Sequence, residues 1–161
     1  MRITEEHVFF WTGRDIYSNF HYSPFKHEGK LFNWSEQAVM YRKAKLFGAN
    51  DIANRILLET DPVNCKRLGR SRKIDFKEDV WEKERERIYK EVLLDKFSIP
   101  YLKQQLLETK DKIIVEASPY DTIWGIGMGE NDKGVDNPRN WRGQNLLGKV
   151  LMEVREELRK Q

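Results

Sequence analysis

The feature that most constrains the fold is a charged stretch from Glu78 to Lys96 in which apolar residues recur at helical spacing. Trp81, Ile88 and Val92 fall near one face of a helix, and Glu, Lys and Arg fill the opposite face. The pattern predicts one long amphipathic helix.

The length and composition of the chain predict a single domain. The chain has 161 residues, of which 39% are hydrophobic and 34% are charged. These values suit one domain over residues 1–161 with one hydrophobic core, and they exclude a disordered chain.

Shorter patterns on either side predict further helices and a few strands. β-Prone runs occur at His7 to Trp11, in a hairpin from Phe25 to Trp34, and at Lys112 to Ala117. Helical patterns cover Ser35 to Gly48, Asp51 to Leu58, Pro62 to Gly69, Ile99 to Glu108 and Leu146 to Leu158. Ser35, Asp51 and Asp61 are expected to cap the first three helices with a side-chain oxygen.

Composition narrows the function classes. The 29 basic and 26 acidic residues give a net charge of +3 and are interleaved, so charge alone does not predict a nucleic-acid surface. The lone cysteine, Cys65, cannot form an internal disulfide, and the first apolar run is too short for a signal peptide or membrane span, so we expect a soluble cytoplasmic protein. Because His7, His21, His27 and Cys65 lack metal-ligand spacing, we expect no bound metal and no cofactor.

Candidate chemistry begins in the helix expected from Ser35. Glu36, Met40 and Lys43 lie at i, i+4 and i+7, which places a carboxylate and an amine on one helix face. Glu36 falls in the first turn, where the helix dipole is expected to lower the pKa of its carboxyl group. A carboxylate there suits a base, or the stabilisation of positive charge on a ribose during cleavage of an N-glycosidic bond. The alternative is a solvated helix face around a core methionine.

The stretch from Ser118 to Gly143 is the most irregular part of the chain and is rich in Gly and Pro. A loop of this length inside a compact domain is usually functional or disordered. In it Asp121 is followed by Trp124 and by alternating glycines that begin at Gly125. Indole faces stack on nucleobases, and glycines let a ligand approach the backbone, so this stretch is a candidate ligand site. The alternative is a structural glycine-rich turn that is held in place by a packed tryptophan. No helix follows directly, which excludes a dinucleotide fingerprint.

Two further segments are candidates for phosphate binding. Gly143 and Asn145 precede the C-terminal helix, where exposed backbone N–H groups favour an anion, although Asn145 equally suits a helix N-cap. Arg70, Arg72 and Lys73 form a basic connector that either offers phosphate charge or is simply solvent-exposed. The sequence contains no P-loop motif.

Six motifs occur in order along nearly the whole chain. They are Tyr17-Ser18-Asn19-Phe20; Trp34-Ser35-Glu36-Gln37-Ala38 with Lys43-Ala44; Leu68-Gly69-Arg70; Trp81 with Arg85; Asp121-x-x-Trp124-Gly125; and Gly143-x-Asn145-x-x-Gly148. In order and rough spacing they resemble the YbiA/NADAR family. The resemblance implies an α+β fold, mostly helical around a small β-sheet, and an N-glycosidase. It implies either release of ribose 5-phosphate from phosphoribosylaminopyrimidine intermediates of riboflavin biosynthesis or removal of ADP-ribose from guanine in nucleic acid.

The resemblance also implies roles for individual residues. Glu36 and Asp121 would form the polar catalytic core, Lys43 would be an imine-forming nucleophile at C1 or a phosphate contact, and Trp124 would stack on the base or line the pocket. The other expected substrate-binding residues are Ser18, Asn19, Phe20, Trp34, Arg70, Trp81, Gly125, Gly143 and Asn145. An imine requires a neutral Lys43, which desolvation or a nearby cation favours and the Glu36 carboxylate opposes. The sequence leaves that conflict open.

Two other function classes are compatible with the sequence. A binding module would hold NAD or ADP-ribose with the same glycines and aromatics without cleaving it, but the acid and amine on one helix face favour catalysis. A nucleic-acid-binding protein fits the pI of about 8.9 and the 12% aromatic residues, but not the lack of a basic stripe. The expected partners are therefore a phosphoribosyl or ADP-ribosyl small molecule or ADP-ribosylated nucleic acid.

Overall fold

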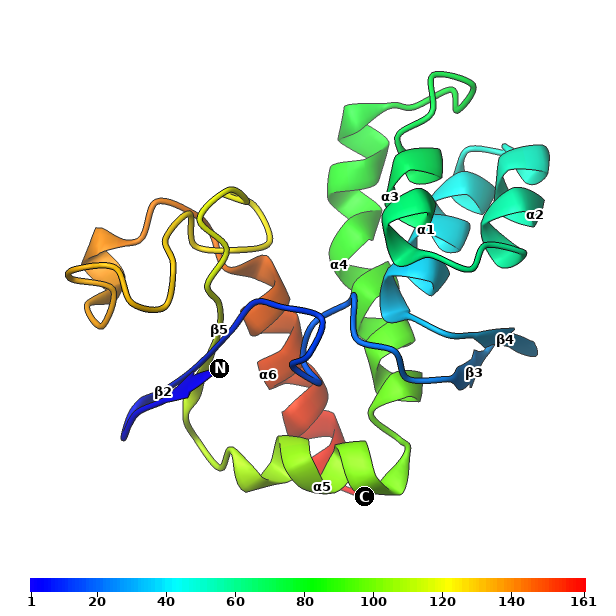
Figure 1. The fold of residues 1–161 in the computed structure, drawn as a ribbon. Coiled ribbons are helices and arrows are strands. Elements are labelled where there is room, and N and C mark those ends of the chain that lie inside the picture. Colours follow the sequence, from blue (N-terminus) through cyan, green and yellow to red (C-terminus); the bar gives the residue numbers. More distant parts are fainter. The chain divides into compact units, whose positions relative to one another are not determined.

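The computed structural model describes residues 1–161, which divide into two compact units. Unit 1 comprises Met1–Ser18 and Phe97–Gln161, and unit 2 comprises Asn19–Lys96. Each unit has its own helices and its own small sheet (Figure 1). A single domain over residues 1–161 stays a prediction.

Unit 1 is built on a three-stranded sheet in the order β1-β2-β5. Its strands are β1 (Arg2–Ile3), β2 (His7–Phe10) and β5 (Ile113–Glu116). β1 pairs antiparallel with β2, and β2 pairs parallel with β5, with Val8 opposite Ile114. All four residues of β2 are buried, as is typical of a strand in a parallel pair, so this segment lacks an alternating pattern.

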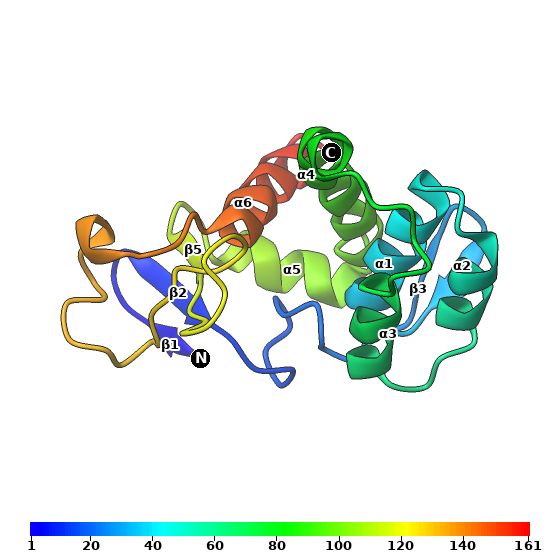
Figure 2. The ribbon, with the colours of Figure 1, turned by 90° about the horizontal axis from the view of Figure 1, so that it is seen from above.

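Two helices and a long loop complete unit 1. α6 (Leu146–Arg159) packs along β5 (Figure 2), and α5 (Pro100–Glu108) packs on α6. The loop between β5 and α6 is irregular apart from the short 3-10 helix η1 (Pro138–Asn140), as the sequence predicts. Its apolar residues Ile126, Met128 and Val135 pack on Phe9 and Val115 of the sheet. The loop is therefore anchored in the core.

Unit 2 combines four helices with a β-hairpin. α1 (Ser35–Leu46) contacts the other three helices, which gather around it in Figure 1: α2 (Asn50–Leu57), α3 (Pro62–Gly69) and α4 (Glu78–Lys96). The hairpin of β3 (Phe25–His27) and β4 (Lys30–Phe32) packs against α4 and α1. Glu28 and Gly29 form its turn with φ of 50° and 78°, the left-handed conformation that a two-residue hairpin turn requires.

The three predicted helix caps have different outcomes. Asp61 caps α3, since its Oδ1 accepts a hydrogen bond from the Val63 N–H at 2.9 Å. The prediction for Ser35 is wrong, because Trp34 is the N-cap of α1 and the Ser35 hydroxyl instead donates to Asn19 Oδ1. The prediction for Asp51 is also wrong, because α2 begins at Asn50 and Asp51 lies within its first turn.

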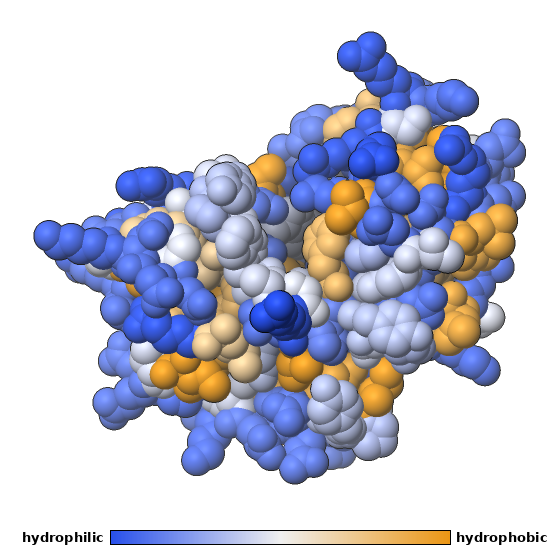
Figure 3. All heavy atoms as spheres, viewed as in Figure 1, coloured by the Kyte–Doolittle hydropathy of each residue, from blue (hydrophilic) through white to orange (hydrophobic).

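The predicted fold class is confirmed, since the protein is α+β and mostly helical, with two small sheets in place of the single sheet expected. α4 has the predicted bounds, Glu78–Lys96. None of the helices is both long enough and apolar enough to span a lipid bilayer. Figure 3 shows a largely hydrophilic face with small hydrophobic patches between polar residues, in keeping with the interleaved charges of the sequence.

Candidate active site

The predicted carboxylate and amine lie on α1 in unit 2. Glu36 occupies the first turn and its residue surface is only 6% exposed, whereas Lys43 lies two turns further along and is partly exposed. Met40, the residue between them on this face, is buried. The alternative of a fully solvated face around a methionine is therefore wrong for Glu36, because this carboxylate lies inside the protein surface.

Two aromatic rings enclose the Lys43 amine. Its Nζ lies 4.8 Å from the ring centroid of Phe76 and 5.3 Å from that of Trp81. The Phe47 ring packs edge-on against the Phe76 ring, with centroids 5.3 Å apart, and so supports the position of Phe76. The amine is therefore held over aromatic faces that attract a cation and partly exclude water.

Opposing influences act on the protonation of Lys43. Burial lowers the pKa of its amine, and the Arg70 guanidinium lowers it further. The Glu36 and Glu78 carboxylates raise this pKa, but the net direction is downward from the ordinary value of 10.5. Desolvation and the neighbouring cation thus outweigh the two carboxylates in direction, and the role of Lys43 as a nucleophile stays a prediction.

Close packing of α3 on α1 explains how Arg70 comes to act on Lys43. A Cβ added to Gly69 would lie 2.1 Å from Met40 Sδ, so the lack of a side chain at Gly69 allows the two helices to approach. Arg70 follows directly at the C-terminal end of α3. The Leu68-Gly69-Arg70 motif therefore combines a contact glycine with a cation.

The segment before α1 supports the Glu36 backbone. The carbonyl of Asn19 accepts a hydrogen bond from the Glu36 N–H at 3.0 Å, and Asn19 Oδ1 accepts one from the Ser35 hydroxyl at 2.8 Å. Trp34 is buried against the ring of Tyr22. Phe20 lies near Lys66, whose Nζ is 5.8 Å from its ring centroid.

A thiol nucleophile is excluded in this part of unit 2. Cys65 is fully buried in α3, and burial, with the charges of Glu59, Glu36 and Asp61, raises the pKa of its thiol to about 12. Such a thiol remains protonated at neutral pH and is inert. Nowhere in residues 1–161 do three or more His, Cys, Asp or Glu side chains gather as metal ligands would.

The predicted residues of unit 1 engage mainly backbone groups. Asp121 Oδ1 accepts hydrogen bonds from the N–H groups of Ile123 and Trp124 at 2.9 and 2.8 Å, which closes the turn that carries the partly buried Trp124 indole. Ser18 is buried, and its N–H donates to the Asp15 carbonyl. Asp121 is therefore a turn-forming residue in this geometry.

Gly125, Gly143 and Asn145 hold the end of the loop against β5. A Cβ on Gly143 would lie 2.3 Å from the Gly125 carbonyl oxygen. Asn145 occupies the N-cap position of α6 in the left-handed conformation, with φ of 54°, but its side chain makes no capping bond. Instead its Oδ1 accepts from the Glu116 N–H and its Nδ2 donates to the Ile114 carbonyl, each at 3.0 Å. The N-cap alternative for Asn145 is thus confirmed in position but not in its capping bond.

Comparisons with known proteins agree with the predicted family. The model of the NADAR domain matches residues 9–159. The chain belongs to the NADAR family. Protein irg-1 of Caenorhabditis elegans is 39% identical over 96% of this chain and 81% of its own length. N-glycosidase R617 of Acanthamoeba polyphaga mimivirus is 46% identical over 76% of this chain and 72% of its own length.

A plant relative and a solved structure extend the comparison. The chloroplastic riboflavin biosynthesis protein PYRR of Zea mays is 34% identical over 81% of this chain, a match that covers 20% of the plant protein. The NMR structure of the E. coli protein YbiA has a TM-score of 0.79 and 28% identity, covering 99% of this chain and 88% of that one. The prediction of an enzyme that acts on N-glycosyl bonds is confirmed at the level of the NADAR family.

Sequence reasoning missed two residues of the Lys43 surroundings. Phe76 lies in the connector between α3 and α4, outside any periodic pattern, so only the fold shows that its ring reaches Lys43. Glu78 begins α4 as an acid in the first turn and raises the pKa of Lys43. In the sequence, only the position of Glu78 after the basic connector could have indicated a role near Lys43. An acidic residue there is equally typical of an ordinary helix start.

Proposed function

We propose that this NADAR protein hydrolyses the N-glycosidic bond of a phosphorylated ribosyl base, and that phosphoribosylaminopyrimidine intermediates of riboflavin biosynthesis are its substrates. The observation that carries the proposal is the Lys43 amine, desolvated between two aromatic rings and close enough to the buried Glu36 for that carboxylate to act on its pKa. The relatives named N-glycosidase support the reaction class, and the plant riboflavin protein supports the substrate.

Lys43 acts in this proposal as the nucleophile at C1 of the ribose. The lone pair of its neutral amine attacks C1, and the base leaves with the electrons of the N-glycosidic bond and takes up a proton. The ribosyl amine then opens to an imine. Water adds to the imine carbon and returns the free amine with release of ribose 5-phosphate. Burial and the Arg70 guanidinium lower the pKa of Lys43, which favours the neutral amine that the first step requires.

Positive charge develops on C1 and the ring oxygen as the base departs. The Glu36 carboxylate, fixed in the first turn of α1, offsets that charge electrostatically. The faces of Phe76 and Trp81, which lie against the Lys43 amine, also favour a cation. These groups stabilise the charge of the transition state more than the neutral ground state, which is the condition for catalysis.

Arg70 is the proposed phosphate contact. It is exposed, carries a permanent charge and lies near enough to Lys43 to lower its pKa. In unit 1, Asp121 shapes the turn that carries the Trp124 indole, and base stacking by Trp124 stays a prediction.

Product analysis by mass spectrometry tests the proposal. The wild type, Glu36→Gln and the exposed control Glu82→Gln are each incubated with a phosphoribosylaminopyrimidine, with free NAD or ADP-ribose, and with DNA carrying ADP-ribosylated guanine. We expect ribose 5-phosphate from the first substrate in the wild type and the control, and its loss in Glu36→Gln. Release only from the DNA would replace the proposed substrate by ADP-ribosylated nucleic acid. Binding without cleavage in every case would indicate a non-catalytic module.

A further inference from the structure

We propose that Lys96 is a positioning residue that holds Glu36 in its working place through Ser35 and Asn19. The inference rests on the proposed function for its effect on catalysis. It concerns a residue outside all six motifs, at the opposite end of unit 2 in the sequence from Asn19.

Lys96 is a lysine with no exposed surface. It is the last residue of α4, and its exposed fraction is 0%. Burial lowers the pKa of its amine to about 7. Burying an amine costs free energy that an apolar side chain of the same size would not cost. A lysine at this position therefore calls for a role that its amine performs.

The amine is connected to the segment before α1 by side-chain hydrogen bonds. Lys96 Nζ lies 3.4 Å from Ser35 Oγ, and Ser35 Oγ lies 2.8 Å from Asn19 Oδ1. A hydroxyl has one hydrogen, and Ser35 donates it to the Asn19 oxygen, so Ser35 Oγ accepts in its contact with Lys96. In this hydrogen-bond chain, Lys96 thus donates to Ser35 and Ser35 donates to Asn19.

The other end of this chain is the backbone of Glu36. The N–H groups of the first turn of a helix have no partner within the helix, and α1 lacks a side-chain cap. The Asn19 carbonyl accepts the Glu36 N–H at 3.0 Å and so replaces that cap. Because Lys96 and Ser35 orient the Asn19 side chain, they help to fix the residue whose carbonyl holds Glu36.

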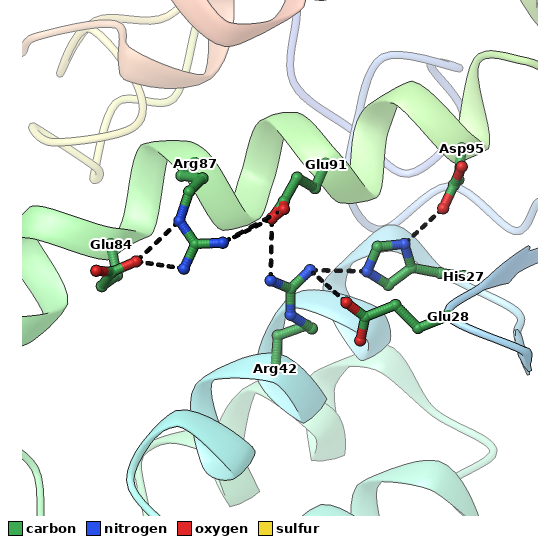
Figure 4. A network of polar contacts seen from close by, with 7 residues as sticks. All are labelled: His27, Glu28, Arg42, Glu84, Arg87, Glu91 and Asp95. Atoms are coloured by element: carbon green, nitrogen blue, oxygen red, sulfur yellow. Dashed lines mark hydrogen bonds and ion pairs between the residues drawn. The ribbon is translucent and has the colours of Figure 1, made fainter.

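Polar contacts also fix the C-terminal end of α4, so the backbone that carries Lys96 is held in place. Asp95 Oδ2 lies 2.6 Å from His27 Nδ1, and Arg42 lies 2.9 Å from His27 Nε2 (Figure 4). A guanidinium only donates, so Nε2 accepts and Nδ1 carries the hydrogen given to Asp95. Arg42 also bonds Glu91 one turn earlier on α4 at 3.2 Å. The last two turns of α4 are therefore tied to β3 and α1.

The experiment compares Lys96→Met, Ser35→Ala and the control Lys83→Met, an exposed lysine on the same helix. Methionine preserves length and apolar volume but removes the donor. We expect the Glu36 backbone amide to exchange with solvent at least about tenfold faster in Lys96→Met and Ser35→Ala. We expect kcat to fall about tenfold to a hundredfold with KM nearly unchanged, because a displaced carboxylate loses transition-state stabilisation. Lys83→Met should change neither.

The outcomes separate the inference from the proposed function. Unchanged exchange of the Glu36 amide in both variants would overturn the inference, as would faster exchange with an unchanged kcat. If the wild type cleaves none of the substrates, the proposed function fails, and amide exchange alone decides whether Lys96 holds Glu36. If Lys96→Met fails to fold, Ser35→Ala breaks the same chain at its next member and carries the test.

Discussion

The family motifs in unit 2 and those in unit 1 have different physical characters. In unit 2 they supply ionisable groups in unusual surroundings, with Lys43 held between aromatic rings and Glu36 buried in a first turn. In unit 1 they supply hydrogen bonds to backbone groups, with Asp121 closing a turn and Asn145 joining the start of α6 to β5. We propose that motifs which resemble a family equally well serve chemistry in one unit and architecture in the other.

The difference shows how to separate catalytic from structural motif residues. A side chain whose polar atoms already bond the backbone gives little free energy to a transition state, because those bonds would first have to break. A desolvated amine beside a carboxylate is costly to maintain and is typical of a functional site. Substitutions of Glu36 and Lys43 should therefore lower turnover, and substitutions of Asp121 and Asn145 should lower stability.

The largest expected effect is that of Lys43→Met. Removing the nucleophile should lower kcat by about a hundredfold to a thousandfold while the fold is retained, since Lys43 is partly exposed. Sodium borohydride added during turnover should fix the substrate sugar on the wild type, with a mass increase at Lys43 and none in Lys43→Met. A reduced adduct that persists in Lys43→Met would contradict the role of Lys43.

The next effect in size is a loss of stability in unit 1. Asn145→Ala removes two hydrogen bonds to β5, one of them fully buried, and places a less tolerant residue at a positive φ, so we expect the free energy of unfolding to fall by about 3 kcal/mol. Chemical denaturation measures this change. Turnover per folded molecule should remain within about twofold of the wild type, and a hundredfold loss of kcat with normal stability would break the contrast between the units.

The pH dependence of stability sharpens the account of Lys96. Its pKa is about 7 in the folded protein and 10.5 as an ordinary lysine, so between these values the unfolded chain binds a proton that the folded chain has lost. The free energy of unfolding should therefore rise with pH across this window, by up to about 1.4 kcal/mol per pH unit. Below pH 7 the full cost of burying the charge remains.

Lys96→Met lacks that titration and provides the control. Its stability advantage over the wild type should be greatest near pH 6.5 and should shrink by roughly 2 kcal/mol by pH 9. Denaturation curves of both proteins at the two pH values measure the change. An advantage that is the same at both pH values would contradict the lowered pKa.

The smallest expected effect is that of Gly69→Ala. The added methyl group would lie 2.1 Å from Met40 Sδ and 3.0 Å from its Cγ, so the Met40 side chain must repack, and we expect a loss of about 1 kcal/mol in the free energy of unfolding. A shift of α3 away from α1 should also move Arg70 from Lys43 and reduce its influence on the amine. The kcat/KM profile against pH should then rise at a higher pH than in the wild type. A profile identical to that of the wild type would show that Arg70 does not act through this contact.

Periodic patterns predicted most of the fold. The bounds of α4 follow from its apolar spacing, and the hairpin follows from Glu28-Gly29 between two short runs. The cap of α3 was predictable because Asp61 precedes a proline. Ser35 does not cap α1, because its hydroxyl donates to the Asn19 side chain instead. A partner that lies 16 residues earlier in the chain leaves no local signal.

The candidate site was predictable only where one helix carries it. Glu36 and Lys43 follow from the spacing within α1, but Phe76 and Lys96 join their surroundings through tertiary packing. Likewise the backbone bonds of Asp121 could not be separated from a catalytic role by composition or spacing, because both uses favour an acid before a turn. The geometry shows the turn-forming bonds of Asp121 Oδ1, and the catalytic role of this carboxylate stays a prediction.

The most direct test of the contrast is a paired measurement of Glu36→Gln and Asp121→Asn, each with kcat on the same phosphoribosylated substrate and stability by denaturation. Both changes remove a charge at nearly constant shape. The account predicts that Glu36→Gln lowers kcat by at least about a hundredfold with little change in stability. It predicts that Asp121→Asn keeps kcat within about threefold and costs about 1 kcal/mol of stability. The reverse pattern, with Asp121→Asn inactive and Glu36→Gln active, would contradict it.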